Sequence, residues 1–193
     1  MNIIGITGNS GSGKSEVTKM LVKKYDAELI DSDKIARYLS ENNSDYLNEI
    51  IRGFGNDIVD RNKKLNRQKL AKEIYNDKNK RKLLNSITFK YITKQIEDQI
   101  KNSDKKIAIV DAPLLFESKL DKICSKTIGV ISNKETKIAR IIARDNISKQ
   151  TAQKRIETQL SDDFLKEKCD YIINNDFDNM EELEKEINSI NLI

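Results

Sequence analysis

A glycine-rich stretch near the start of the chain has the residue types and spacing of a phosphate-binding loop. Residues 5–17 read GITGNSGSGKSEV and hold four of the seven glycines in the 193-residue chain. The stretch fits the pattern G-x-x-x-x-G-K-[ST] and lies between an apolar run and a helical pattern, as such a loop requires. Because Gly8, Gly11 and Gly13 have no side chain, backbone N–H groups there can approach a phosphate closely. We therefore expect a nucleotide polyphosphate to bind at this loop.

The residues that end this loop are expected to contact the phosphates and a magnesium ion. Lys14 would reach the β- and γ-phosphates, and the hydroxyl of Ser15 would ligate Mg²⁺. Ser12 and Glu16 complete the predicted nucleotide-binding set, Glu16 through its backbone N–H. The helix expected to begin at Lys14 adds unpaired N–H groups and the positive end of the helix dipole, which both favour an anion.

Two acidic clusters follow expected strands. In LIDSDKIAR, Asp31 and Asp33 would project to the same side of an extended segment, where one carboxylate could accept a proton from an attacking hydroxyl or orient it. The residues alone leave another interpretation equally open, because Ser32 or Asp33 could simply cap a following helix. In IVDAPLLFES, Asp111 ends an apolar strand, which is typical of a carboxylate that contacts Mg²⁺ directly or through water.

Two arginines further along could neutralise the charge of a transferring phosphoryl group. Arg140 and Arg144 are spaced i, i+4, so both lie on one side of the expected helix and could close over the phosphates. The alternative is a solvated charged face that includes Asp145, and the phosphate-binding loop is what favours the chemical role. The chain contains no histidine, so any general base would be a carboxylate or a less usual group.

Strands that alternate with helices predict an α/β fold with a parallel sheet covered on both faces. Apolar runs indicate strands at 3–7, 28–31, 107–111, 127–131 and 171–173, and helical patterns lie at 14–25, 134–144 and 179–190. A long, nearly all-helical insertion, about 34–103, separates the second and third strands. It would emerge near the carboxyl ends of the strands, where the ligand crevice of an open α/β sheet lies, and could hold a second substrate.

The composition narrows the class of partner. A formal net charge of +4 suits a phosphorylated small molecule, and the basic runs RNKK and KNKRK are more typical of solvated surface, so no nucleic-acid partner is predicted. Cys124 and Cys169 lie too far apart to indicate a zinc site or a disulfide framework. With no signal-peptide pattern and no apolar run near the length of a membrane span, we expect a cytoplasmic protein without a membrane partner. Nothing predicts an oligomeric state.

Together these motifs resemble the dephospho-CoA kinase family over nearly the whole chain. The matching segments, in chain order, are GITGNSGSGKSEV, LIDSDKIAR, FGNDIVD, LNRQKLAKEIYND, LLNSI, APLLFES, ARIIARD, TQLS and CDYIINND. The loop is generic, whereas D-x-D-x-x-x-R, PLLFE and R-x-x-x-R-D are more specific. The resemblance implies one domain, 1–193, with a three-layer P-loop kinase core. Its expected parts are the core at about 1–33, 104–136 and 161–193, a helical acceptor-binding region at about 34–103, and a short helical lid at about 137–160.

The resemblance also implies an activity. Members transfer the γ-phosphoryl group of ATP to the 3′-hydroxyl of the dephospho-CoA ribose, giving CoA and ADP in the last step of CoA biosynthesis, with Mg²⁺ as cofactor. Asp33 matches the catalytic carboxylate, and Arg37 would lie near the acceptor. Arg140 and Arg144 match the lid arginines, and Asn175 matches an asparagine near the base of the nucleotide. Because phosphoryl transfer relies on positioning and charge neutralisation, the lack of histidine is no obstacle.

Three positions depart from the family pattern. Thr88-Phe89 stands where His-Pro is usual, although Thr88 keeps a hydroxyl that could contact the acceptor. Glu16 replaces a threonine and places an anion near the α-phosphate unless its side chain turns to solvent. Phe177 stands at the place of a common glycine, which bears on the shape of the adenine pocket.

Two other functions compete with this one. Other P-loop kinases, acting on a nucleoside, a nucleotide or a shikimate-like alcohol, share the loop, the acidic cluster and the arginine lid. They require neither the 34–103 insertion nor PLLFE. A switch GTPase would need the guanine-selecting motif N-K-x-D, and the nearest segment, NKET at 133–136, ends in threonine.

Overall fold

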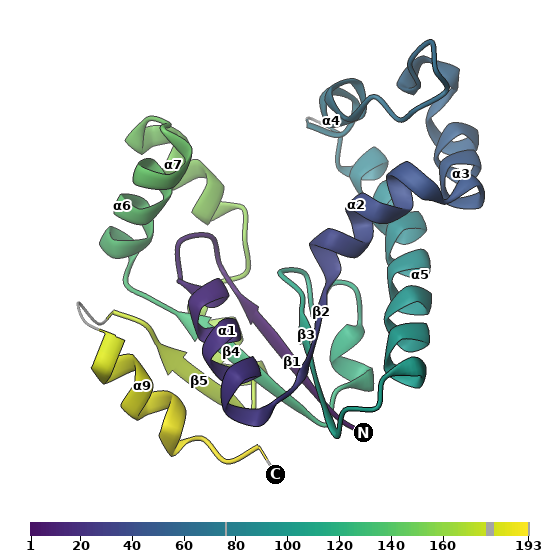
Figure 1. The fold of residues 1–193 in the computed structure, drawn as a ribbon. Coiled ribbons are helices and arrows are strands. Elements are labelled where there is room, and N and C mark those ends of the chain that lie inside the picture. The colour runs from purple at the N-terminus through teal and green to yellow at the C-terminus, as the bar shows by residue number, and fades with distance from the viewer. Residues whose placement is uncertain (76, 177–179, 193) are drawn as a thin grey trace. The chain divides into compact units, whose positions relative to one another are not determined.

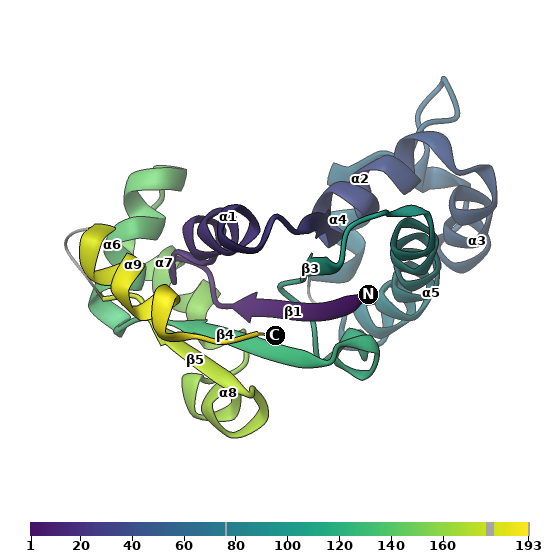
Figure 2. The ribbon, with the colours of Figure 1, turned by 60° about the horizontal axis from the view of Figure 1, so that its bottom comes forward.

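The computed structural model describes residues 1–75, 77–176 and 180–192. It divides the chain into two units, the first comprising Met1–Ile30 and Ser103–Ile193 and the second Asp31–Asn102. Figure 1 labels most of the helices and strands of both units, and Figure 2 also labels α8. Within the described residues, none of the helices combines the length and the apolar character needed to cross a membrane.

A five-stranded sheet forms the centre of the first unit, in the order β2-β3-β1-β4-β5. The central strand β1 pairs in parallel with β3 and β4, and β4 pairs in parallel with β5. Each strand begins and ends within one residue of the bounds predicted from the sequence. The strands are β1 (Asn2–Gly8), β2 (Glu28–Asp31), β3 (Ile107–Asp111), β4 (Lys126–Ile131) and β5 (Tyr171–Asn174).

Helices cover both faces of this sheet. The helices of the first unit include α1 (Lys14–Tyr25), α8 (Asp162–Lys168) and α9 (Met180–Ser189). Two more, α6 (Lys134–Asp145) and α7 (Lys149–Glu157), pack against each other through a cluster of their own. Helices α1 and α9 lie together on one face, while α8 packs against β4 and β5 on the other (Figure 2). Alternate residues of β4 serve the two faces, since Ile128 and Val130 join the core beneath α1 and α9 whereas Gly129 faces Leu165 of α8. The predicted three-layer α/β fold is confirmed.

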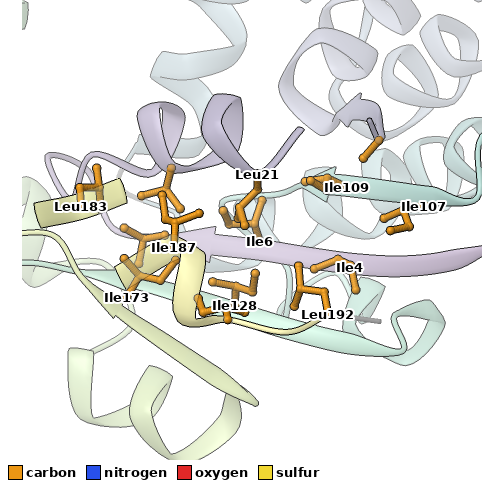
Figure 3. Close-up of a cluster of buried hydrophobic side chains, with 14 residues drawn as sticks. Ile4, Ile6, Leu21, Ile107, Ile109, Ile128, Ile173, Leu183, Ile187 and Leu192 are labelled. Carbon is orange, nitrogen blue, oxygen red and sulfur yellow. The ribbon is translucent and has the colours of Figure 1, made fainter. Parts of the chain in front are cut away.

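The core between the sheet and α1 and α9 consists of aliphatic side chains (Figure 3). Full burial of each such side chain favours folding by about 1.5–3 kcal/mol. Because residues of both β1 and α1 pack into this core, the two ends of the loop that joins them are held in place. The labelled residues are Ile4, Ile6, Leu21, Ile107, Ile109, Ile128, Ile173, Leu183, Ile187 and Leu192.

The second unit is mainly helical, as predicted. Its helices are α2 (Ser32–Asn42), α3 (Ser44–Phe54), α4 (Arg67–Tyr75) and α5 (Lys78–Asn102). Helices α2, α3 and α4 each pack against the long α5. Leu39 of α2, Ile50 of α3 and Ile96 of α5 are buried in this unit. The unit therefore has apolar packing of its own around α5.

Helix α2 begins earlier than the sequence indicates. It starts at Ser32, directly after β2, so Asp33 lies in the first helical turn. Asp31 is the N-cap, and its Oδ1 accepts hydrogen bonds from the backbone N–H groups of Asp33 and Lys34, both at 3.0 Å. The prediction that Asp31 and Asp33 share one side of an extended segment is wrong, and neither Ser32 nor Asp33 is the cap. A carboxylate at the last strand residue satisfies the first helical N–H groups, which lets the helix begin at once.

Candidate active site

The glycine-rich loop connects β1 to α1, where the sequence places it. Gly11 and Gly13 have φ angles of +81° and +80°, in the left-handed region that favours glycine. A Cβ on Gly11 would come within 2.5 Å of the carbonyl oxygen of Lys137, and one on Gly13 would collide with the amide of Asn175. Both positions therefore require glycine because of backbone conformation and because of close approach.

The first turn of α1 offers backbone donors to an anion. Gly13 precedes this helix and provides no side-chain cap. The N–H groups of Glu16 and Val17 bond to the carbonyl of Gly13, at 3.0 and 3.4 Å. Those of Lys14 and Ser15 precede the first intrahelical acceptors, as at every helix start. With the helix dipole, this end of α1 suits a phosphate group.

Three side chains meet where β3 ends. Lys14 Nζ forms an ion pair with Oδ1 of Asp111, and both side chains are 13% exposed. The hydroxyl of Thr18, which is buried, donates to Oδ2 of Asp111 at 3.3 Å. Thr18 is a residue that the loop motif does not indicate, although it lies one helical turn after Lys14 and so on the same face of α1. The structure thus brings Lys14 and Asp111 together, because β1 and β3 are neighbours in the sheet.

The oxygen atoms at this place have the chemistry that Mg²⁺ prefers. Asp111 offers a carboxylate, and Ser15 and Thr18 offer hydroxyls on the first turns of α1. The described part of the chain contains no group of three or more His, Cys, Asp and Glu side chains that could hold a metal. A magnesium ion here would complete its shell with phosphate oxygens and water, as this ion usually does in nucleotide sites. The residues therefore fit an ion that arrives with a nucleotide.

Asn175 and Arg140 hold the backbone of the loop. Asn175 is buried, and its Nδ2 donates to the carbonyl of Ser12 at 2.9 Å. Nη1 of Arg140 donates to the carbonyls of Gly11, at 3.3 Å, and of Asn175, at 3.0 Å. The predicted proximity of Asn175 to the base of a nucleotide stays a prediction. Phe177, which bears on the same pocket, lies outside the described residues.

Arg144 lies one turn further along α6 and is tied to its neighbour. Its Nη2 donates to the hydroxyl of Ser10 at 3.2 Å, and its guanidinium forms two hydrogen bonds, at 2.7 and 2.9 Å, with the carboxylate of Asp145. Arg155 of α7 is also ion-paired with Asp145. The hydrogen bond from Arg144, with smaller contributions from Arg155, lowers the pKa of Asp145 to about 2. One carboxylate therefore joins the ends of α6 and α7.

The side chain of Glu16 lies along the outside of α1. Its Oε2 is 3.2 Å from Nζ of Lys19, and the side chain is 45% exposed. The carboxylate is thus partly neutralised by a lysine at the surface. This position, toward Lys19 and solvent, reduces the repulsion that a carboxylate next to the loop would otherwise exert on a bound phosphate.

The residues predicted for the acceptor lie in the second unit. Asp33 and Arg37 are exposed and one helical turn apart on α2. Thr88 is half-buried on α5, and its hydroxyl is 3.1 Å from the phenol oxygen of Tyr46 on α3. Burial raises the pKa of that phenol. The structure therefore places Asp33 and Arg37 on one exposed face of α2 and engages Thr88 in a hydrogen bond inside the helical unit.

Comparison with known proteins identifies the family. The family model for dephospho-CoA kinase matches residues 2–181. The chain belongs to the dephospho-CoA kinase family. Among its relatives in this family, the dephospho-CoA kinase of Fusobacterium nucleatum subsp. nucleatum is 40% identical over 185 residues, covering 96% of this chain and 94% of the relative. The predicted resemblance is therefore confirmed.

Solved structures show how widely the fold of this family member is shared. A Thermus thermophilus crystal structure aligns with a TM-score of 0.82 at 24% identity, over 97% of this chain and 95% of that one. Shikimate kinase from Bacteroides thetaiotaomicron aligns with a TM-score of 0.54 at 14% identity, over 97% and 94%. Because a kinase of another substrate has a similar fold, the fold alone does not separate dephospho-CoA kinases from other small-molecule kinases.

Proposed function

We propose that this chain transfers the γ-phosphoryl group of ATP to the 3′-hydroxyl of the dephospho-CoA ribose, giving CoA and ADP. The family match over residues 2–181 carries this proposal. The geometry of the first unit supports it, because Lys14 follows the loop and Arg140 and Arg144 donate hydrogen bonds to the loop residues Gly11 and Ser10. The proposed location is the cytoplasm, where ATP is available.

The first unit would bind ATP and neutralise its charge. Backbone N–H groups of Gly11 and Gly13 and of the first turn of α1 would contact the phosphates. Lys14 would exchange Asp111 for the β- and γ-phosphates, and Arg140 and Arg144 would stabilise the charge that spreads over the transferring group. Asp111 and Ser15 would hold Mg²⁺, which supplies further charge neutralisation when bound.

The second unit would position the acceptor. Asp33 would accept a hydrogen bond from the ribose hydroxyl, and Arg37, one turn along α2, would contact an anionic part of dephospho-CoA. Thr88 would contribute its hydroxyl only after exchanging its bond to Tyr46. A strong base is unnecessary, because phosphoryl transfer passes through a loose transition state in which the nucleophile needs mainly orientation.

Product analysis tests this proposal. The protein is incubated with ATP and Mg²⁺ and with dephospho-CoA, adenosine, AMP, pantothenate, shikimate or no acceptor. We expect CoA from dephospho-CoA and no product from the others. Lys14→Ala and Asp33→Asn should each lower the rate by about a hundredfold or more, since each removes a group that acts on the reacting atoms. The exposed residues Lys23 and Asp45 provide the matched controls, Lys23→Ala and Asp45→Asn, which should keep the parent rate.

A different acceptor would move the assignment within the P-loop kinases. If ADP forms with shikimate or a nucleoside and no CoA forms from dephospho-CoA, the proposed substrate is wrong and the phosphate site is kept.

The pH–rate profile of Asp33→Asn, compared with that of the parent enzyme, tests the role of this carboxylate. An orienting role predicts a lower rate with a profile of unchanged shape, whereas a general base predicts loss of the acidic limb.

A further inference from the structure

An ion pair between a buried lysine and a half-buried aspartate lies behind the apex of the phosphate loop. Lys137 of α6 is 3% exposed, and its Nζ is 2.6 Å from both carboxylate oxygens of Asp162 at the start of α8. Taking the charge of the lysine out of water and that of the aspartate partly out of water is costly, and replacing a buried ion pair by apolar residues is often neutral or stabilising. Stability alone is therefore a weak reason for this pair.

The same carboxylate reaches the loop. Nδ2 of Asn9 donates to Oδ1 of Asp162 at 3.3 Å and to the carbonyl of Leu160 at 2.8 Å. The backbone N–H of Ser10 donates to Oε1 of Gln159 at 3.0 Å. Two consecutive loop residues are thus bonded to the segment 159–162 that leads into α8.

The opposite side of the loop apex is held by α6. The backbone of Lys137 lies so close to Gly11 that a Cβ there would meet the Lys137 carbonyl at 2.5 Å. Arg140, less than one turn further on, donates to the carbonyl of Gly11. Lys137 therefore connects Asp162 to the loop, since its side chain binds Asp162 and its backbone contacts Gly11.

We propose that Asp162 is a positioning residue for ATP, which acts through Asn9 and Lys137 on the shape of the phosphate loop; this inference rests on the proposed function. Held between α6 and the segment before α8, the loop loses less conformational entropy when it binds the phosphates. The ammonium of Lys137 neutralises the carboxylate of Asp162, which would otherwise repel a polyphosphate.

This role predicts a particular division of kinetic effects. The loop would bind the phosphates equally well in the ground state and in the transition state. A less ordered loop should therefore raise KM for ATP with little change in kcat. The KM for dephospho-CoA should stay the same. A residue that only stabilises the fold would change the amount of folded enzyme and leave both KM values untouched.

The test compares neighbouring aspartates. Asp162→Asn removes the charge behind the loop, and Asp163→Asn makes the same change on a side chain that is 93% exposed. ATP binding is measured by calorimetry with Mg²⁺ and without acceptor, followed by steady-state kinetics. We expect Asp162→Asn to raise Kd and KM for ATP about tenfold, the scale of one charged hydrogen bond, and Asp163→Asn to leave both unchanged.

A second variant keeps the proposal decidable if Asp162→Asn fails to fold. Asn9→Ala cuts the link to the loop while the ion pair with Lys137 stays intact, and it should raise Kd for ATP to a similar extent. Unchanged ATP affinity in folded Asn9→Ala would overturn the proposal, as would an equal rise in KM for dephospho-CoA in Asp162→Asn. Because calorimetry needs no acceptor, a protein that binds ATP and makes no CoA would contradict the proposed reaction only.

Discussion

Two buried hydroxyls near the phosphate loop differ in their hydrogen bonding. Ser12 Oγ is fully buried and has no hydrogen-bond partner in the described residues, whereas Thr18 Oγ1 donates to Asp111. A buried polar group without a partner carries its desolvation penalty without compensation. The same kind of atom therefore has opposite effects on stability at positions six residues apart.

This difference leads to a prediction for a pair of substitutions. Ser12→Ala should keep or raise the free energy of unfolding, because it removes an unsatisfied hydroxyl. Thr18→Val should lower it by about 1–2 kcal/mol, because the shape is kept and Asp111 loses a donor. Urea unfolding without nucleotide and Mg²⁺ measures both values. If Ser12→Ala has a lower free energy of unfolding than the parent protein, the hydroxyl of Ser12 has a hydrogen-bond partner in solution.

The sequence predicts individual residues well where a motif fixes them in one local segment. Lys14 is such a residue, and Asp111 is found because it ends an apolar strand that neighbours β1. Thr18 could have been found by helical spacing from Lys14. The pair Lys137–Asp162 could not, because 25 positions separate its members and the packing of α6 near α8 brings them together. No local pattern reports such a contact.

At the scale of elements, one carboxylate links α6 and α7, which also pack against each other through Ile138, Ile141 and Ala152. Asp145 ends α6, and Arg155 projects from α7, with Arg144 bound to the same group. Since the pKa of Asp145 is lowered to about 2, folding favours the charged carboxylate. This contribution is complete above the ordinary carboxyl pKa near 4 and is lost as the pH falls toward 2. Between pH 6 and 9 the contact is therefore constant.

We expect this carboxylate to orient Arg144 toward the loop. Asp145→Asn should lower kcat by about tenfold with the same factor at pH 6 and pH 9, because a charged hydrogen-bond partner of the arginine is lost. In an Arg144→Ala background the same substitution should have little further effect, since Asp145 acts through Arg144. A double-mutant cycle in steady-state kinetics measures this coupling, with Glu157→Gln at the exposed end of α7 as the control. Additive effects would contradict the expected role.

The elements themselves follow closely from the sequence, with one informative exception. Buried parallel strands are short apolar runs, so all five are recognisable. The start of α2 is the exception, because Asp31 is both the last residue of β2 and the N-cap of α2. That dual role arises where β2 ends and α2 begins without a linker. Asp33 consequently occupies a helical turn, with Arg37 one turn further along the same exposed face.

At the scale of the whole molecule, the candidate residues divide between the two units. The phosphate loop, Asp111, Arg140 and Arg144 belong to the first unit, and Asp33, Arg37 and Thr88 belong to the second. Composition and periodicity predict a sheet with a helical insertion. They do not predict which unit binds which substrate, because substrate binding depends on individual side chains that contact the ligand and not on the overall pattern of elements.

Hydrogen exchange measured with each substrate separately tests this division. A ligand that binds only the native protein raises the free energy of opening by about 2.7 kcal/mol at a hundredfold excess over its Kd. With ATP and Mg²⁺, we expect slower exchange in residues 8–16 and 137–162 of the first unit. With dephospho-CoA alone, we expect slower exchange in 31–42 of the second unit, and pantothenate should leave both unchanged. If dephospho-CoA protects only the first unit, Asp33 and Arg37 do not hold the acceptor, and the catalytic carboxylate must be sought near Asp111 instead.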